Sequence, residues 1–200
     1  MLVIADGKRG DVPVSAAAYG QALVGSTPTP FGDVEGLGAD AFTANPLLGG
    51  DALDPLVDAA EAAGAGVFAL VRTSNPGAAD ILDAPAPDAP LHERLAGIVA
   101  ARAGRLAGQG EGRGLSGMGA VAGATEPGFL ARLRELMPAA VFLLPGVGAQ
   151  GGDPVALGAA FSDHPASAIV TASRSIAGAD DPAGAAGRLR DAVASVAPAG

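Results

Sequence analysis

Residues 66–77 read GVFALVRTSNPG, and this stretch decides the fold class of the chain. Its first six residues form a continuous apolar run, which is typical of a strand that is buried on both faces. The run ends in a polar cluster whose Asn-Pro and Pro-Gly pairs are turn formers. Strands that are apolar on both faces belong to parallel sheets covered by helices, so the stretch predicts an α/β protein.

The same pattern recurs along the chain, where short apolar runs alternate with Ala-rich stretches of helical pattern. Strands are expected at 2–5, 41–44, 66–71, 118–123, 141–144 and 168–171, and helices at 13–24, 51–63, 91–108, 126–136, 154–161 and 182–196. The Gly-, Pro- and Thr-rich segment 25–38 is expected to be an irregular loop, as is the Pro-rich segment 84–90. The strand–helix units predict a single domain over residues 1–200.

Two architectures fit these units, a doubly wound open sheet and a (β/α)8 barrel. Polar clusters follow nearly every predicted strand, and barrels build their sites from many strand ends, whereas an open sheet uses one switch point. We therefore predict a (β/α)8 TIM-type barrel. A complete barrel typically needs about 250 residues, and the sequence carries only six units, so we expect a barrel that lacks its first two units.

Composition excludes several functions. The net charge of −9 argues against nucleic-acid binding, which needs a basic surface. Cys is absent, which removes disulfides, thiolate nucleophiles and Cys zinc sites, and the two histidines, His92 and His164, are isolated. No run approaches the roughly 20 apolar residues of a membrane helix, and the carboxylate of Asp6 comes early for a signal peptide. We predict a cytoplasmic protein without a metal, a membrane or a nucleic-acid partner.

The first candidate site is DGKRGD at residues 6–11, which holds the only Lys of the chain. Residues two apart on a strand share a face, so Asp6 and Lys8 are expected to lie side by side. Lys can release a proton and Arg effectively cannot, which suits Lys8 for a proton donor. Gly7 and Gly10 allow a sharp exit that could bring Asp11 back toward the pair. The alternatives are a surface ion-pair cluster, and for Asp11 a cap of the following helix.

Two further segments are candidates for ligand binding. PGVGAQGG at residues 145–152 is glycine-rich, and its backbone N–H groups and the following helix N-terminus could bind a phosphate. Arg174, after the last strand, could clamp the same anion. RTSNPG at residues 72–77 offers hydroxyls and an amide to the edge of a polar ring. For both segments the alternative is an ordinary turn.

Together these segments resemble the orotidine 5′-phosphate decarboxylases, especially the longer bacterial subgroup. The matching stretches are IADGKRGD (4–11), NPLLGGDAL (45–53), GVFALVRTSNPGA (66–78), GAVAGAT (119–125), LLPGVGAQGG (143–152) and SRSI (173–176). The resemblance implies a (β/α)8 barrel dimer without cofactor or metal. It also implies decarboxylation of orotidine 5′-monophosphate to UMP in pyrimidine biosynthesis.

The resemblance assigns three catalytic residues. Lys8 matches the family's proton-donating lysine, and Asp6 matches the carboxylate set beside the substrate's own carboxylate. Asp11 matches the aspartate that each subunit lends to its partner's site, which implies a homodimer with shared active sites. The chain departs from the family at Gly7, where Ala is usual. The aspartate and lysine that the family's first two strands supply have no counterpart in this sequence.

The resemblance also assigns four substrate-binding residues. Ser74 matches the residue at the pyrimidine edge, and Gln150 and Arg174 match the residues that hold the 5′-phosphate. Ser15 keeps the hydroxyl of the family's usual Thr, within a stretch that otherwise departs from the pattern. Two alternatives stay open: an inactive remnant that binds phosphate or nucleotide, and a related sugar-phosphate decarboxylase, which would need a metal. Activity that survives a chelator would favour the pyrimidine nucleotide.

Overall fold

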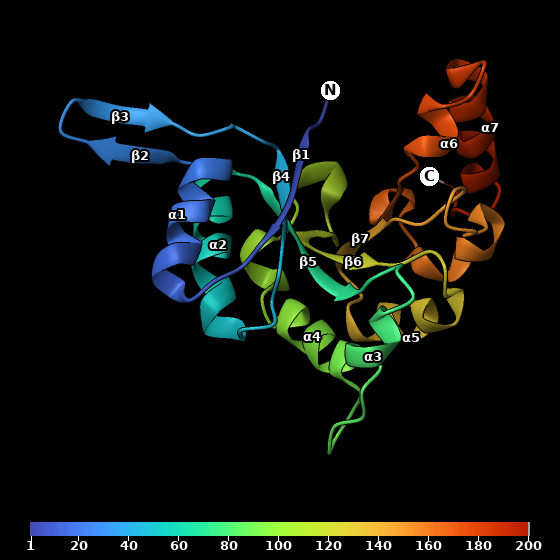
Figure 1. Cartoon of the computed structure of the whole chain (residues 1–200), viewed down its shortest axis with the longest axis horizontal. Coiled ribbons are helices and arrows are strands. Elements are labelled where there is room, and N and C mark those ends of the chain that lie inside the picture. Colours follow the sequence, from blue (N-terminus) through green and yellow to red (C-terminus); the bar gives the residue numbers. More distant parts are fainter. Residues whose placement is uncertain (200) are drawn as a thin grey trace.

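The structure is a computed structural model that describes residues 1–199. Its centre is a six-stranded sheet in which each neighbouring pair is parallel (Figure 1). The strands, in their order across the sheet, are β1 (Ile4–Arg9), β4 (Ala41–Ala44), β5 (Gly66–Arg72), β6 (Ser116–Ala122), β7 (Ala140–Leu144) and β8 (Ala168–Val170).

The order of the strands separates the two predicted architectures. The strands follow one another across the sheet in chain order, with no point at which the direction of winding reverses. A doubly wound sheet has such a reversal, and a barrel does not. Within residues 1–199, β1 and β8 each pair on one side only, so the sheet is an open arc of six strands. The predicted barrel class with six units is therefore confirmed.

The helices that pack their buried residues against the outer face of this arc are α1 (Pro13–Leu23), α2 (Gly50–Ala63), α4 (Leu91–Ala100) and α5 (Leu130–Leu136). The short helix α3 (Ala78–Ile81) follows β5, and α6 (Arg174–Ala177) and α7 (Pro182–Ala194) pack against each other after β8. The main core lies between sheet and helices and contains Phe42, Phe142 and Leu56, all fully buried. α1 and α2 lie side by side (Figure 1), and a Cβ on Gly20 would come within 2.6 Å of Ala59 Cβ. Small residues therefore let these two helices pack closely.

The inner face of the arc carries a smaller apolar cluster. Phe68, Val121 and Leu143 are buried there, and Ile4 and Leu70 pack against them. These residues alternate along their strands with residues of the main core, as a strand that is buried on both faces requires. The apolar side chains of each strand are thus divided between two clusters, one on the helix-covered face and one on the inner face of the arc.

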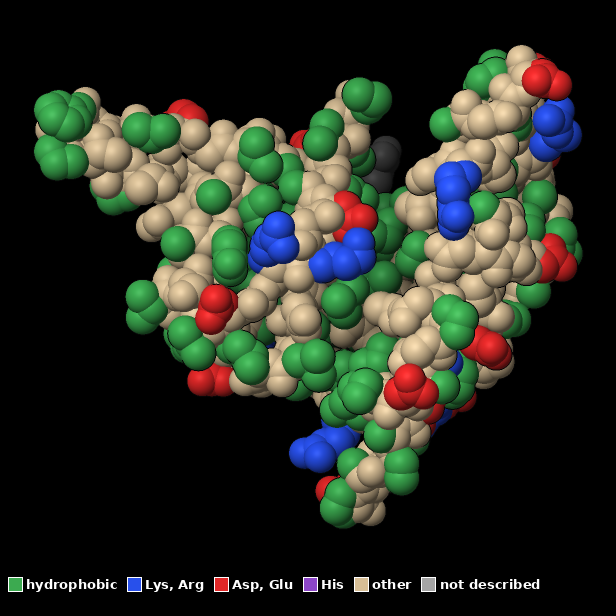
Figure 2. All heavy atoms as spheres, in the orientation of Figure 1, with side chains coloured by type: hydrophobic (Ala, Val, Ile, Leu, Met, Phe, Trp, Pro, Cys, Tyr) green, Lys and Arg blue, Asp and Glu red, His purple; other side chains and the backbone are tan. Residues whose placement is uncertain are grey.

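Segment 25–38 is not the irregular loop that its composition predicts. It contains a two-stranded antiparallel hairpin of β2 (Ser26–Thr29) and β3 (Gly32–Glu35). Gly32 has a φ of 112°, and its carbonyl accepts a hydrogen bond from Thr29 Oγ1 at 2.6 Å, which closes the turn. The hairpin projects away from the arc (Figure 1), and hydrophobic side chains cover its tip (Figure 2), where Phe31 is 99% exposed.

Three predicted helices are shorter or tighter than expected. The predicted helix 91–108 ends as α4 at Ala100, and a 3-10 turn follows at Ala103–Leu106. Between them, Arg102 Nε donates a hydrogen bond to Asp54 Oδ1 of α2 at 2.8 Å. Helix 126–136 divides into a 3-10 turn at Pro127–Phe129 and α5. Helix 154–161 is a 3-10 helix, Pro154–Ala160. Strand 2–5 lies further along the chain, as β1, and runs through the DGKR motif.

Candidate active site

A cleft of about 590 Å³ opens on the inner side of the arc, at the carboxyl ends of the strands. Asp6 and Lys8 of β1, Ser74 after β5 and Gln150 after β7 all line it. Three segments that the sequence singled out therefore meet in one place. The floor is apolar and includes Val121 and Leu143 of the inner cluster. Figure 2 shows basic and acidic side chains gathered over β1 in the middle of this face.

Asp6 and Lys8 form the pair that the strand periodicity predicts, with Lys8 Nζ 2.6 Å from Asp6 Oδ1. Their side chains remain 59% and 48% exposed, so the ion pair adds little to folding stability. Lys8 has a φ of 49° and is the only non-glycine residue among residues 1–199 with a positive φ. Such strain is found mainly where function requires a particular geometry.

A bulge explains this backbone. On the β1–β4 ladder Ala5 lies opposite Phe42, whereas Arg9 lies opposite Ala44, so β1 carries extra residues in this interval. Gly10 then passes so close to β4 that a Cβ would meet the Asn45 carbonyl oxygen at 2.2 Å. Because Gly10 has no side chain, the two backbones can pass this closely. The bulge directs the Lys8 side chain over the cleft.

The electrostatics keep Asp6 ionised. Partial burial raises the pKa of Asp6, but the hydrogen bonds from Lys8 and Thr43 and the positive charge of Lys8 outweigh it, and the net pKa is below the ordinary value. At neutral pH the cleft thus holds a fixed carboxylate beside an ammonium group. Such a pair can repel an incoming carboxylate and present a proton within one site.

Thr43 is a member of this site that the sequence analysis missed. It lies in β4 and is fully buried. Its hydroxyl accepts a hydrogen bond from the Lys8 N–H at 2.9 Å and donates one to Asp6 Oδ1 at 2.9 Å. The only signal in the sequence is a hydroxyl within the otherwise apolar strand AFTA, at the level of the Asp6–Lys8 motif on the neighbouring strand.

A smaller pocket of about 120 Å³ adjoins the cleft and shares Gln150 and Ser173 with it. Arg174, the first residue of α6, lines this pocket with Gly146, as the predicted phosphate clamp requires. The φ angles of Gly146, Gly148 and Gly151 are all positive (113°, 75° and 88°), so the loop between β7 and the next helix needs its glycines.

The expected contribution of the next helix to phosphate binding is wrong. That helix is the 3-10 helix Pro154–Ala160, and the carboxylate of Asp153 already caps it by accepting a hydrogen bond from the Val155 N–H at 3.0 Å. A carboxylate at this end repels a phosphate. Three N–H groups of the glycine loop also bond within the loop, those of Gly148, Gly151 and Gly152. Arg174 is therefore the main positive charge of the pocket.

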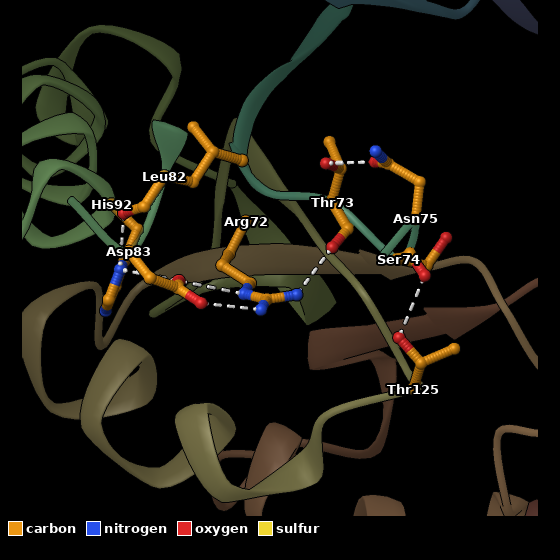
Figure 3. Close-up of polar contacts among 8 residues, drawn as sticks. All are labelled: Arg72, Thr73, Ser74, Asn75, Leu82, Asp83, His92 and Thr125. Carbon is orange, nitrogen blue, oxygen red and sulfur yellow. Dashed lines mark hydrogen bonds and ion pairs between the residues drawn. The ribbon is translucent and has the colours of Figure 1, made fainter. Parts of the chain in front are cut away.

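The Ser74 segment is held from two sides (Figure 3). Buried Arg72 donates two hydrogen bonds to Asp83, at 3.2 and 2.8 Å, and one to the Thr73 carbonyl at 2.9 Å. On the other side, Thr125 Oγ1 donates to the Ser74 carbonyl at 3.0 Å. The hydrogen bonds from Arg72 lower the pKa of Asp83 and keep it ionised. The backbone of Ser74 is therefore fixed at the cleft.

His92 belongs to the same support, not to the cleft. It is buried, with Nδ1 2.8 Å from the Leu82 carbonyl oxygen and 3.4 Å from Asp83 Oδ1. The ring of Phe129 contacts His92 edge to face at 5.0 Å, and the Arg72 guanidinium lies 4.7 Å from the same ring centroid. The helix α4 that carries His92 is thus coupled to the Ser74 segment.

A family model described as orotidine 5′-phosphate decarboxylase / HUMPS family matches residues 1–189. The chain belongs to this family. The orotidine 5′-phosphate decarboxylase of Deinococcus radiodurans is 43% identical over 174 residues, which are 87% of this chain and 58% of the relative. That of Rhodopirellula baltica is 40% identical over 177 residues, 88% of this chain and 56% of the relative. The chain thus spans less than two thirds of the length of these curated relatives.

A solved structure of the same family agrees with the fold. The Leishmania donovani OMP decarboxylase is similar over 98% of this chain and 68% of its own, with a TM-score of 0.73 and 30% identity. The resemblance carried by the sequence motifs is therefore confirmed at the level of the family, and the barrel class is confirmed with it. The roles of single residues in this OMP decarboxylase family member stay predictions.

Two predicted site residues, Asp11 and Ser15, line neither the cleft nor the adjoining pocket. Asp11 follows β1, and its Oδ1 accepts a hydrogen bond from the Val12 N–H at 2.7 Å. Val12 occupies the N-cap position of α1, and no side chain caps the free N–H groups of the first turn. Asp11 therefore does not cap this helix. Ser15 lies in the first turn of α1 and does not line the cleft either. The roles that the sequence assigns to these two residues stay predictions.

Among the side chains that the structure describes, no three of His, Cys, Asp or Glu are grouped so that they could hold a metal ion. Within residues 1–199 no helix has both the length and the apolar character needed to span a membrane.

Proposed function

We propose that the protein decarboxylates orotidine 5′-monophosphate to UMP in pyrimidine biosynthesis. The observation that carries the proposal is the Asp6–Lys8 pair, held on a strained bulge over a cleft that Ser74 and Gln150 also line. The names of relatives at 43% and 40% identity support the same reaction. The proposal needs no cofactor, and the cytoplasmic location stays a prediction from the sequence.

The chemistry places a positive charge where negative charge develops. When the bond between the ring carbon and the carboxylate breaks, CO2 leaves and the electron pair stays on the ring carbon. The Lys8 ammonium stabilises this carbanion and then transfers one proton from Nζ to it, which forms the C–H bond of UMP. The ionised Asp6 repels the substrate carboxylate before it leaves, and this repulsion is relieved as CO2 departs.

Binding energy from the phosphate can be used at the reacting carbon. Gln150 lines both the cleft and the smaller pocket, so a ligand in the cleft can extend its 5′-phosphate toward Arg174. Interactions with remote groups lower the barrier when they offset unfavourable contacts at the reacting centre. Arg174 holding the phosphate would thus hold the substrate carboxylate against Asp6.

Arg174→Ala is expected to weaken binding of UMP by about tenfold to a hundredfold, because a charge-assisted hydrogen bond contributes roughly 1.5–3 kcal/mol. Binding of uridine, which has no phosphate, is expected to change by less than about twofold. Calorimetric titration of both ligands measures the difference. Arg188→Ala, which removes an arginine of α7 outside the pocket, is the matched control. Equal losses for UMP and uridine would make Arg174 structural.

The proposal includes a homodimer whose active sites are shared through Asp11. Asp11 lies at the exit of β1 and outside the cleft of its own chain. The residues beside it are apolar and exposed, 55% for Val12 and 85% for Val14. An apolar surface around a carboxylate favours burial against a second copy, which would bring Asp11 to the partner's cleft.

Mixing two inactive variants tests the shared site. Lys8→Ala and Asp11→Ala are each expected to be inactive alone. After subunit exchange, some mixed dimers pair an intact Lys8 with the partner's intact Asp11, and activity should return in about a quarter of the sites. Mass spectrometry of the mixture confirms the exchange. Confirmed exchange without recovered activity would refute the sharing of Asp11.

The reaction itself is tested by incubating the protein with orotidine 5′-monophosphate and measuring UMP and CO2, with and without EDTA. We expect turnover that the chelator leaves unchanged. Loss of turnover with EDTA would favour a metal-dependent sugar-phosphate decarboxylase. Binding of UMP without turnover would favour an inactive remnant that binds nucleotides.

A further inference from the structure

The Thr43 hydroxyl hydrogen-bonds both halves of the Asp6–Lys8 motif from a neighbouring strand. It accepts the Lys8 N–H and donates to Asp6 Oδ1, both at 2.9 Å. A hydroxyl has one proton to donate, and that proton goes to Asp6, so the lone pairs face the Lys8 amide. Thr43 therefore acts as the acceptor for Lys8 and as the donor for Asp6, and neither role can be reversed while both hydrogen bonds are kept.

The hydrogen bonds of Thr43 fix the positions of Asp6 and Lys8 more firmly than the exposed ion pair between them can. The side chains of Asp6 and Lys8 are about half exposed, and exposed ion pairs are weak and mobile. The backbone of Lys8 is strained at a φ of 49°, and the surrounding structure must stabilise it. Thr43 is fully buried in β4, which pairs with β1 on one side and β5 on the other, so these neighbouring strands fix its position.

We propose that Thr43 is a positioning residue, which holds the Asp6 carboxylate and the Lys8 backbone in the arrangement that the reaction needs. Thr43 does not line the cleft, so it acts through these two residues and not on the substrate. The inference rests on the proposed decarboxylation and adds a residue that neither the motifs nor the family resemblance assigned. It predicts an effect on turnover with little effect on substrate binding.

Thr43→Val keeps the shape of the side chain and removes the hydroxyl. We expect kcat to fall by about tenfold to a hundredfold, the range for a hydrogen bond to a charged group, with KM changed by less than about threefold. Thr43→Ser restores the hydroxyl and is expected to recover kcat to within about threefold of the parent. A fall in kcat that Thr43→Ser does not rescue would overturn the proposal.

Phe42→Leu is the matched control, because Phe42 is the neighbour of Thr43 in β4 and is fully buried in the main core on the other face. It is expected to lower the melting temperature at least as much as Thr43→Val and to leave kcat within about twofold, since it touches neither Asp6 nor Lys8. If both variants lower kcat equally, Thr43 is merely structural and the proposal is wrong.

A titration that needs no turnover separates this inference from the proposed function. The hydrogen bond from Thr43 lowers the pKa of Asp6, so Thr43→Val is expected to raise it. NMR of the Asp6 carboxyl carbon in the folded variants measures the shift. If the parent protein fails to decarboxylate orotidine 5′-monophosphate, the proposed function fails, and the titration still decides whether Thr43 orients Asp6. An unchanged Asp6 pKa would overturn the positioning role.

Discussion

Lys8→Arg is expected to abolish turnover while the protein still binds UMP. Arg keeps the positive charge beside Asp6 but cannot release its proton at neutral pH, so the ring carbanion would go unprotonated. General acid catalysis contributes about 10²- to 10⁴-fold to such steps, and turnover should fall by at least that factor. The backbone of the bulge directs the Lys8 side chain over the cleft. A neighbouring residue therefore cannot supply the proton in its place.

Steady-state decarboxylation and calorimetric UMP binding measure the two halves of this result. Arg9→Lys is the matched control, because it is the opposite exchange at an exposed cation next to Lys8, outside the residues that line the cleft. It should leave turnover within about twofold, as expected for a residue outside the reacting centre. Turnover of Lys8→Arg within tenfold of the parent would remove Lys8 from the role of proton donor.

Arg134→Ala is expected to lower the free energy of unfolding by roughly 3–5 kcal/mol, since several buried carbonyl groups lose their donor at once. Arg134 of α5 donates to the carbonyls of Ala140 at 2.7 Å and Ser167 at 3.1 Å, among others. Its guanidinium lies 3.9 Å from the ring centroid of Phe142 in the core. Burial lowers the pKa of Arg134 to about 10, so it remains charged at neutral pH.

Urea unfolding followed by circular dichroism measures this loss. Arg132→Ala on the same helix is the matched control, because Arg132 is exposed and forms its ion pairs with Glu93 and Glu135 at the surface. Its loss should be below about 1 kcal/mol. Equal destabilisation by the two variants would mean that the carbonyl groups around Arg134 find other donors, such as water.

The sequence predicted most of the fold because its signals were local. Apolar runs such as 66–71 became strands of the arc, and polar residues after them met in one cleft. Segment 25–38 was predicted wrongly because Gly and Pro, which suggest a loop, here form the turn of a hairpin. The composition correctly indicates turn-forming residues, but it does not reveal the two short paired strands on either side of the turn.

The site was predictable in part for the same reason. The DGK motif predicts the Asp6–Lys8 contact, because residues two apart on a strand share a face. Thr43 lies 37 residues from Asp6 in the chain, and only the register of β4 against β1 brings them together. The cap at Asp153, which removes the expected helix N-terminus from the phosphate site, also depends on a local geometry that composition does not encode.

The left-handed backbone of Lys8 sets the stability of the protein against its proposed catalytic activity at one position. A glycine adopts a φ of 49° without strain, whereas a side chain there costs of order 1 kcal/mol. Lys8→Gly would therefore relax the bulge and remove the ammonium in the same step. Selection for thermal robustness alone would favour the glycine, so screens of this protein for heat resistance should also select for activity, or they will enrich stable chains that have lost their acid.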